Sequence, residues 1–80
     1  MKASIMSYTG GLQVYEGVRM VRVISEEYNL LIMPGFAPTL GKIDGTVTVL
    51  TDTGETEYSD IHGFFQQKDD VFSLLVGRIQ

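Results

Sequence analysis

The feature of this sequence that most restricts its fold is the regular interruption of short apolar runs by glycine and by turn dipeptides. The chain has nine glycines in 80 residues, and the runs between the breaks are about 4–8 residues long. This spacing is typical of strands in a sandwich or barrel, whereas no stretch combines helical periodicity with helix caps. The runs expected to be strands are 3–9, 12–15, 18–25, 30–33, 46–51, 56–61, 63–68 and 71–76.

The breaks between these runs have the chemistry of tight turns. Asp52-Thr53-Gly54-Glu55 predicts a hairpin, because Gly54 can take the positive φ that such turns need. Asp69-Asp70 is a second turn signal. The sequence therefore predicts an all-β fold: a small two-sheet β-sandwich of about 8–10 short strands, forming one domain over residues 1–80.

Composition excludes several classes of protein. The residues are 44% hydrophobic, but no apolar stretch is long enough to span a membrane, and the N-terminus does not have the pattern of a signal peptide. There is no cysteine, so disulfides and thiolate metal sites are excluded. With a net charge of −4 and six scattered basic residues, neither nucleic-acid binding nor direct membrane insertion is expected.

Little in the sequence supports catalysis. On a strand, Asp60 and His62 project from one face and Ser59 from the other, so these residues cannot form a relay. The aspartates fall mainly at turns without the spacing of a calcium loop, and the glycines form no phosphate-binding motif. We therefore expect no catalytic, metal or cofactor site, and a chain that is not an enzyme.

Some strands are apolar on both sides, which suggests a second covered surface beyond the core. In the run 18–25 one side carries Val18, Met20, Arg22 and Ile24, and the other side is apolar as well. The run 71–76 is similar, and the adjacent Phe64 and Phe65 must face opposite ways. The alternative is an ordinary surface, since protein surfaces are about half apolar.

The segment 30–38 differs from the rest of the chain. A hydrophobic strand runs into a loop in which Phe36 lies between Pro34 and Pro38. A loop stiffened by proline loses little entropy on docking, so Phe36 could be an exposed recognition residue. The alternative is a buried corner in which Phe36 fills one end of the sandwich.

At this segment the chain resembles the N-terminal β-sandwich of the epsilon subunit of F-type ATP synthases. That family shows a "YxG" turn, a "GELGILPGHAPL" segment, a "KPGxxxI" stretch and a "GGF" turn, in this order. The corresponding stretches occur in the same order over about residues 12–76. They are Tyr15-Glu16-Gly17, the segment 30–38, Lys42-Ile43-Asp44-Gly45-Thr46-Val47 and His62-Gly63-Phe64.

The resemblance implies a non-catalytic component of the rotor, or central stalk, that couples the gamma subunit to the c-ring during ion-driven ATP synthesis. It would lie in the cytoplasm, peripheral to the inner or plasma membrane as part of the complex. The family's C-terminal helical hairpin is expected to be absent, and with it the regulation of ATP hydrolysis. Carried over by position, the c-ring-facing loops would be Glu26, Glu27, Tyr28 and Asn29, together with Pro34, Gly35, Phe36 and Pro38.

The surface for the gamma subunit is expected on the run 18–25, through Val18, Met20, Arg22 and Ile24. When isolated, a domain with such an uncovered face is expected to self-associate. A diverged, stand-alone β-sandwich that binds another protein is the alternative function.

Overall fold

A computed structural model describes residues 1–8 and 10–79. It is all-β, as the sequence predicts, although it has seven strands where about 8–10 were expected. The strands are β1 (Lys2–Ser7), β2 (Gly11–Tyr15), β3 (Val18–Ser25), β4 (Asn29–Ile32), β5 (Thr39–Thr51), β6 (Gly54–Lys68) and β7 (Val71–Ile79). Position 9, the end of the expected run 3–9, lies outside the described residues, as does Gln80.

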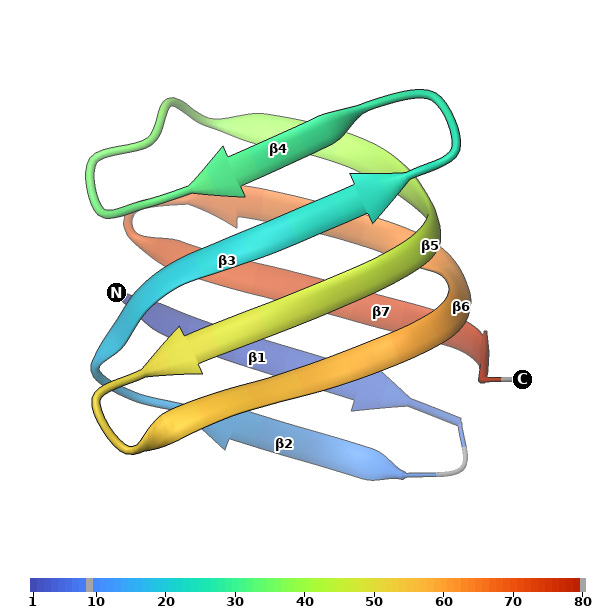
Figure 1. Cartoon of the computed structure of the whole chain (residues 1–80), viewed down its shortest axis with the longest axis horizontal. Helices are drawn as coiled ribbons and strands as arrows, with labels where there is room; N and C mark the ends of the chain where they lie inside the picture. Colours follow the sequence, from blue (N-terminus) through green and yellow to red (C-terminus); the bar gives the residue numbers. More distant parts are fainter. Residues whose placement is uncertain (9, 80) are drawn as a thin grey trace.

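The strands form one continuous hydrogen-bonded sheet in the order β2, β1, β7, β6, β5, β3, β4. The long strands β5 and β6 pair with each other and belong to both layers of the fold. In one layer the C-terminal half of β6 also pairs with β7. In the other layer the half of β5 next to the hairpin also pairs with β3. Figure 1 shows β5 and β6 curving from one layer to the other, with β3 and β4 in front of β1, β2 and β7. The two expected sheets are thus one sheet folded over on itself.

The strand count is lower because β6 continues where the sequence suggested a break. The runs 56–61 and 63–68 are one strand, and β5 begins at Thr39 rather than at position 46. Asp60 has a φ of 53°, and the pairing with β5 shifts register beside it, which marks a β-bulge. A bulge bends and twists a strand without ending it, so the expected turn at His62-Gly63 is a bend inside β6.

Two glycines allow the sheet to fold so closely. At Gly45 a Cβ atom would clash with the backbone oxygen of Ile24, and at Gly63 it would clash with the backbone oxygen of Leu75. Both positions belong to the stretches that resemble the epsilon family. These glycines therefore serve the packing of neighbouring backbones.

The core lies between the two layers and contains side chains from both. It is built almost entirely from β-branched, leucine and phenylalanine residues, as expected for pleated, half-buried surfaces. Phe65 and Phe72 stack with their ring centroids 5.5 Å apart. The buried cluster comprises Ala3, Ile5, Val18, Val21, Val23, Ile32, Ile43, Val47, Val49, Ile61, Phe65, Phe72, Leu74 and Val76.

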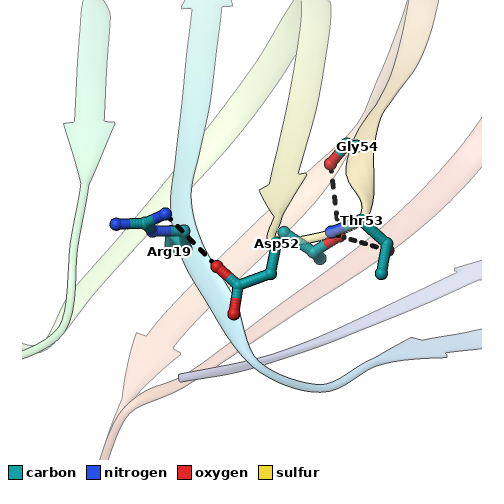
Figure 2. A network of polar contacts seen from close by, with 5 residues as sticks. Arg19, Asp52, Thr53 and Gly54 are labelled. Atoms are coloured by element: carbon teal, nitrogen blue, oxygen red, sulfur yellow. Dashed lines mark hydrogen bonds and ion pairs between the residues drawn. The ribbon is translucent and has the colours of Figure 1, made fainter.

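Both predicted hairpin turns are present. Asp52 and Thr53 connect β5 to β6, and Gly54 has a φ of 144°. Asp69 and Asp70 connect β6 to β7 with φ values of 53° and 58°, the positive pair that a tight two-residue hairpin requires. Figure 2 shows the first hairpin, where the Arg19 guanidinium lies 3.2 Å from the Asp52 carboxylate. Because both side chains are well exposed, this ion pair contributes little to stability.

The part of the chain that the structure describes contains no helix long and apolar enough to cross a membrane.

Candidate interaction face

The outer surface of the β2, β1, β7 and β6 layer carries a line of large apolar side chains. Met6 pairs with Leu12 on one side and with Leu75 on the other, and Leu75 pairs with Phe64. Residues that are directly opposite on neighbouring strands project from the same face. These residues form a continuous line across the layer, which we call the apolar row: Leu12, Met6, Leu75 and Phe64.

Every member of the apolar row is exposed. The exposed fractions are 48% for Met6, 56% for Leu12, 56% for Leu75 and 64% for Phe64. Phe65, the next residue after Phe64, is only 3% exposed, which confirms that the two phenylalanines face opposite ways. This layer therefore carries large apolar side chains on its outer face as well as on the face that forms the core.

On one flank the residues beside the apolar row are uncharged: the neighbouring line of paired residues is Val14, Ser4, Ser73, Gln66 and Leu40. At its Phe64 end the row meets charged groups, with Lys42 opposite Phe64 and the His62–Asp44 pair next along the two strands. Depletion of charge around large apolar side chains is typical of the centre of a protein–protein interface.

The surface at the apolar row is hollowed rather than flat. Two shallow depressions, of about 350 and 530 Å³, share Met6 and Leu75. The smaller is also lined by Leu40 and Phe64, and the larger by Leu12. Side chains of a partner could fill these depressions, which adds shape to an otherwise apolar contact.

The residues of β3 that were predicted to face the gamma subunit do not all lie on one exposed face. Val18 is 2% exposed and packs in the core, so the prediction that it lies on an outward face is wrong. The reason is a register shift between Val18 and Met20, which reverses the alternation of faces at the start of β3. Arg22 and Ile24 are exposed, and Met20 is half-buried.

The outward face of β3 is also more polar than the apolar row. Arg22 lies opposite Thr48 on β5 and opposite Leu31 on β4, and Ile24 lies opposite Thr46. A basic side chain and threonines therefore interrupt the apolar residues there. The sequence contained the signal for the better surface, in the doubly apolar run 71–76 and in the adjacent phenylalanines, but not the pairing that joins them into one line.

The two loops predicted to face the c-ring lie at opposite ends of β4 (Figure 1). The turn of Glu26, Glu27 and Tyr28 precedes β4, which starts at Asn29 and ends at Ile32. Pro34 and the rest of the loop follow the other end. A strand of four residues separates the two loops, and their contact with a c-ring stays a prediction.

The first of these turns is held by hydrogen bonds to β5. The Glu26 N–H donates to the Asp44 carbonyl oxygen at 3.1 Å, and the Tyr28 hydroxyl donates to the Lys42 carbonyl oxygen. Burial raises the pKa of Tyr28 above its ordinary value. Glu26, Glu27 and Tyr28 line a hollow of about 390 Å³ together with Ser25, Lys42 and Asp44.

The second loop is anchored instead of free. The Gly35 N–H donates to the Asp70 carboxylate at 2.8 Å, which ties the loop to the turn between β6 and β7. The Phe36 N–H donates to the Met33 carbonyl oxygen at 3.0 Å, and the Phe36 ring packs against the core while only partly buried. Of the two interpretations of Phe36, the buried corner describes the structure better.

The histidine considered for catalysis lies beside an aspartate on the neighbouring strand. The His62 Nδ1 lies 2.7 Å from an Asp44 carboxylate oxygen, with both side chains substantially exposed. Among residues 1–8 and 10–79 there is no group of three or more histidine, aspartate or glutamate side chains that could hold a metal ion. The geometry at His62 is that of a cross-strand pair between β5 and β6.

A hydroxyl cluster links β2 to the hairpin half of β6. The Tyr15 and Tyr58 hydroxyls are hydrogen-bonded to each other, and both contact the Gln13 side-chain oxygen, at 3.1 and 3.3 Å. Burial, followed by the bond from Tyr15, raises the pKa of Tyr58. No sequence pattern indicated this cluster, because Tyr58 is far from Gln13 and Tyr15 in the chain.

Comparison with known proteins supports the fold. No family model matches the sequence, and no characterised protein matches it significantly by sequence. The structure is similar to a chain in the cryo-EM structure of the central stalk and c-ring of the mitochondrial ATP synthase of Tetrahymena thermophila, with a TM-score of 0.74 and 12% identity. The match covers all of this chain and 65% of the other chain. The likeness is one of fold.

Proposed function

We propose that this protein is a non-catalytic component of the central stalk of an F-type ATP synthase, which contacts the gamma subunit through the apolar row. The observation that carries the proposal is a continuous, exposed and uncharged apolar line on a sandwich whose fold is found in such a stalk. Exposed apolar patches of this kind, rimmed by polar residues, are typical of protein interaction sites. The stretches that resemble the epsilon family add support.

In this role the chain performs no chemistry. Torque would pass through packed surfaces, with Met6 and Leu75 at the centre of the contact, Phe64 at one end, and the neighbouring serines and glutamine along its rim. The chain would lie peripheral to the membrane as part of the complex. The two predicted loops, at opposite ends of the four-residue strand β4, would be the contacts for the c-ring.

One alternative is supported by the apolar row alone. A diverged β-sandwich that binds another protein through the apolar row, without touching a c-ring, needs only one contact surface. In this alternative the apolar row still binds a protein, but the chain is not part of a rotor.

Purification of the complex from the protein's own cells distinguishes the two functions. A tagged chain should recover the gamma subunit together with the catalytic subunits of the synthase, and a Phe64→Lys variant should lose them while keeping its β-sheet circular dichroism. Recovery of a different partner by the wild-type chain, again lost with Phe64→Lys, would support the alternative. If the substitution changes nothing that is recovered, the apolar row is not the binding surface.

A further inference from the structure

Strand β2 is an edge of the sheet that lacks the usual protection of an edge. Within the part of the chain that the structure describes, no strand pairs with its outer side. Natural edge strands are commonly protected by charged residues or proline. The sequence of β2 is Gly-Leu-Gln-Val-Tyr, which contains neither. The other edge strand, β4, is shorter and lies between Glu26-Glu27 and Pro34.

The backbone groups along the open side of β2 can be assigned from the pairing of β1. The Lys2 N–H donates to the Asp70 carbonyl oxygen at 3.0 Å, on the side of β7. Because alternate residues of a strand bond to opposite neighbours, Ile5 of β1 bonds toward β2, where it lies opposite Gln13. The N–H and C=O groups of Leu12 and Val14 therefore point away from β1, and no described strand pairs with them.

The side chains of Leu12 and Val14 are also suited to an added strand. Leu12 and Val14 are 56% and 48% exposed, and they project from the same outer face as the apolar row. They lie symmetrically on either side of Gln13. An added strand would therefore gain main-chain hydrogen bonds and apolar side-chain contacts together.

We propose that β2 is the pairing edge for a second copy of this chain, with the two β2 strands antiparallel and centred on Gln13. In this register Leu12 of each copy lies opposite Val14 of the other and exchanges backbone hydrogen bonds with it. The pairing would also join the apolar rows of the two copies into one surface. This inference does not rest on the proposed stalk function.

Self-complementarity favours a second copy over a foreign strand. The two-fold axis at Gln13 brings apolar residues onto apolar residues, as an isologous interface requires. It also places Glu16 opposite Gly10 of the second copy, so that the glutamates do not face each other. Like charges directly opposite would oppose the pairing, and none occurs in this register.

The mass of the purified protein in solution tests the pairing, by light scattering at about 100 µM. We expect the wild-type chain to be a dimer and Val14→Pro to be a monomer, because proline removes an outward donor and leaves the β1 pairing intact. Leu40→Lys, on β5 and away from the edge, should remain a dimer. A monomeric wild-type chain, or a dimeric Val14→Pro variant, would overturn the proposal.

A disulfide test decides the register even if the proline variant fails to fold. Gln13 of each copy forms the pair that is not hydrogen-bonded, whose Cα separation of roughly 4.5–5.5 Å suits a disulfide. The natural chain has no cysteine. With oxidised glutathione as oxidant, Gln13→Cys should form a covalent dimer, and Gln66→Cys should not. Equal cross-linking of the two variants, or none at position 13, would contradict the pairing.

Discussion

Phe64 and Phe65 are neighbours in β6, yet one belongs to the outer surface and the other to the core. The Phe65 ring stacks on Phe72 with a centroid separation of 5.5 Å, whereas Phe64 is 64% exposed beside Leu75. The core needs only one of them. The exposure of the other, at the end of an uncharged apolar line, is what makes this β-sandwich a binding protein in our account.

The two phenylalanines should therefore separate stability from binding. Phe65→Ala should lower the free energy of unfolding by about 3–5 kcal/mol, because it leaves a cavity in the core. Phe64→Ala should change it by no more than about 0.5 kcal/mol. Chemical denaturation followed by circular dichroism measures both values. Equal losses from the two substitutions would show that Phe64 is part of the core.

Gln67 is a buried polar residue whose removal should stabilise the protein. It is fully buried, and neither the oxygen nor the nitrogen of its side chain has a hydrogen-bond partner among residues 1–8 and 10–79. Gln67→Leu should raise the free energy of unfolding by about 1–3 kcal/mol, because it removes an unpaired amide from the core. Gln66→Leu, exposed on the other face, is the control and should have little effect. A destabilised Gln67→Leu protein would mean that the amide does have a partner, such as a bound water.

Gly45 should be intolerant of even a methyl group. A Cβ there would clash with the backbone oxygen of Ile24, and a backbone atom moves only with its strand. Gly45→Ala should therefore cost about 1–3 kcal/mol of unfolding free energy. At Gly77 the nearest atom to such a Cβ is 3.5 Å away, so Gly77→Ala serves as the matched control. Thermal unfolding of the two variants compares them, and similar melting temperatures would show that the approach of the strands at Gly45 is adjustable.

Tyr58 should make the protein less stable in alkali. Its pKa is raised in the folded state, by burial first and then by the bond to Tyr15, above the ordinary value of 10.0. Below pH 10 the folded and unfolded chains both keep this proton, and the contribution to stability is fully present. It is lost as the pH rises from 10 toward the folded pKa, because the unfolded chain releases the proton first.

Denaturation at a series of pH values checks this dependence on Tyr58. The unfolding free energy of the wild-type protein should fall above pH 10, and that of Tyr58→Phe should fall less steeply. All other ionisable residues are the same in the two proteins, so the comparison isolates the contribution of Tyr58. Parallel curves for the two proteins would contradict the raised pKa.

The sequence predicts local features of this fold well. Gly54 and the Asp69-Asp70 pair identify both hairpins, because positive φ angles restrict which residues can occupy such turns. The alternation of apolar and polar residues also places Phe64 and Phe65 correctly. What the sequence does not reveal is where a strand bends and continues. At Asp60 a bulge bends β6, and the strand continues beyond it. At the start of β3, the register shift between Val18 and Met20 directs the Val18 side chain into the core.

The proposed interaction surface was harder to predict than the fold. Leu12, Met6, Leu75 and Phe64 come from four different strands, and only the pairing of those strands brings them into line. The motifs that resemble the epsilon family include Gly45 and Gly63, which are needed for close packing of the sheet. These two glycines therefore indicate the fold. Binding of a partner depends on outward side chains, which belong to no motif in the sequence.

The affinity of the purified chain for the gamma subunit of the same organism tests the central claim most directly. Titration calorimetry would compare the wild-type chain with Phe64→Lys, on the apolar row, and with Ile24→Lys, on the outward face of β3. We expect the wild-type chain and Ile24→Lys to bind alike, and Phe64→Lys to bind at least about tenfold more weakly, since it places a charge within the apolar contact. Loss of binding in Ile24→Lys but not in Phe64→Lys would move the interface to β3. No binding by the wild-type chain would contradict the stalk function itself.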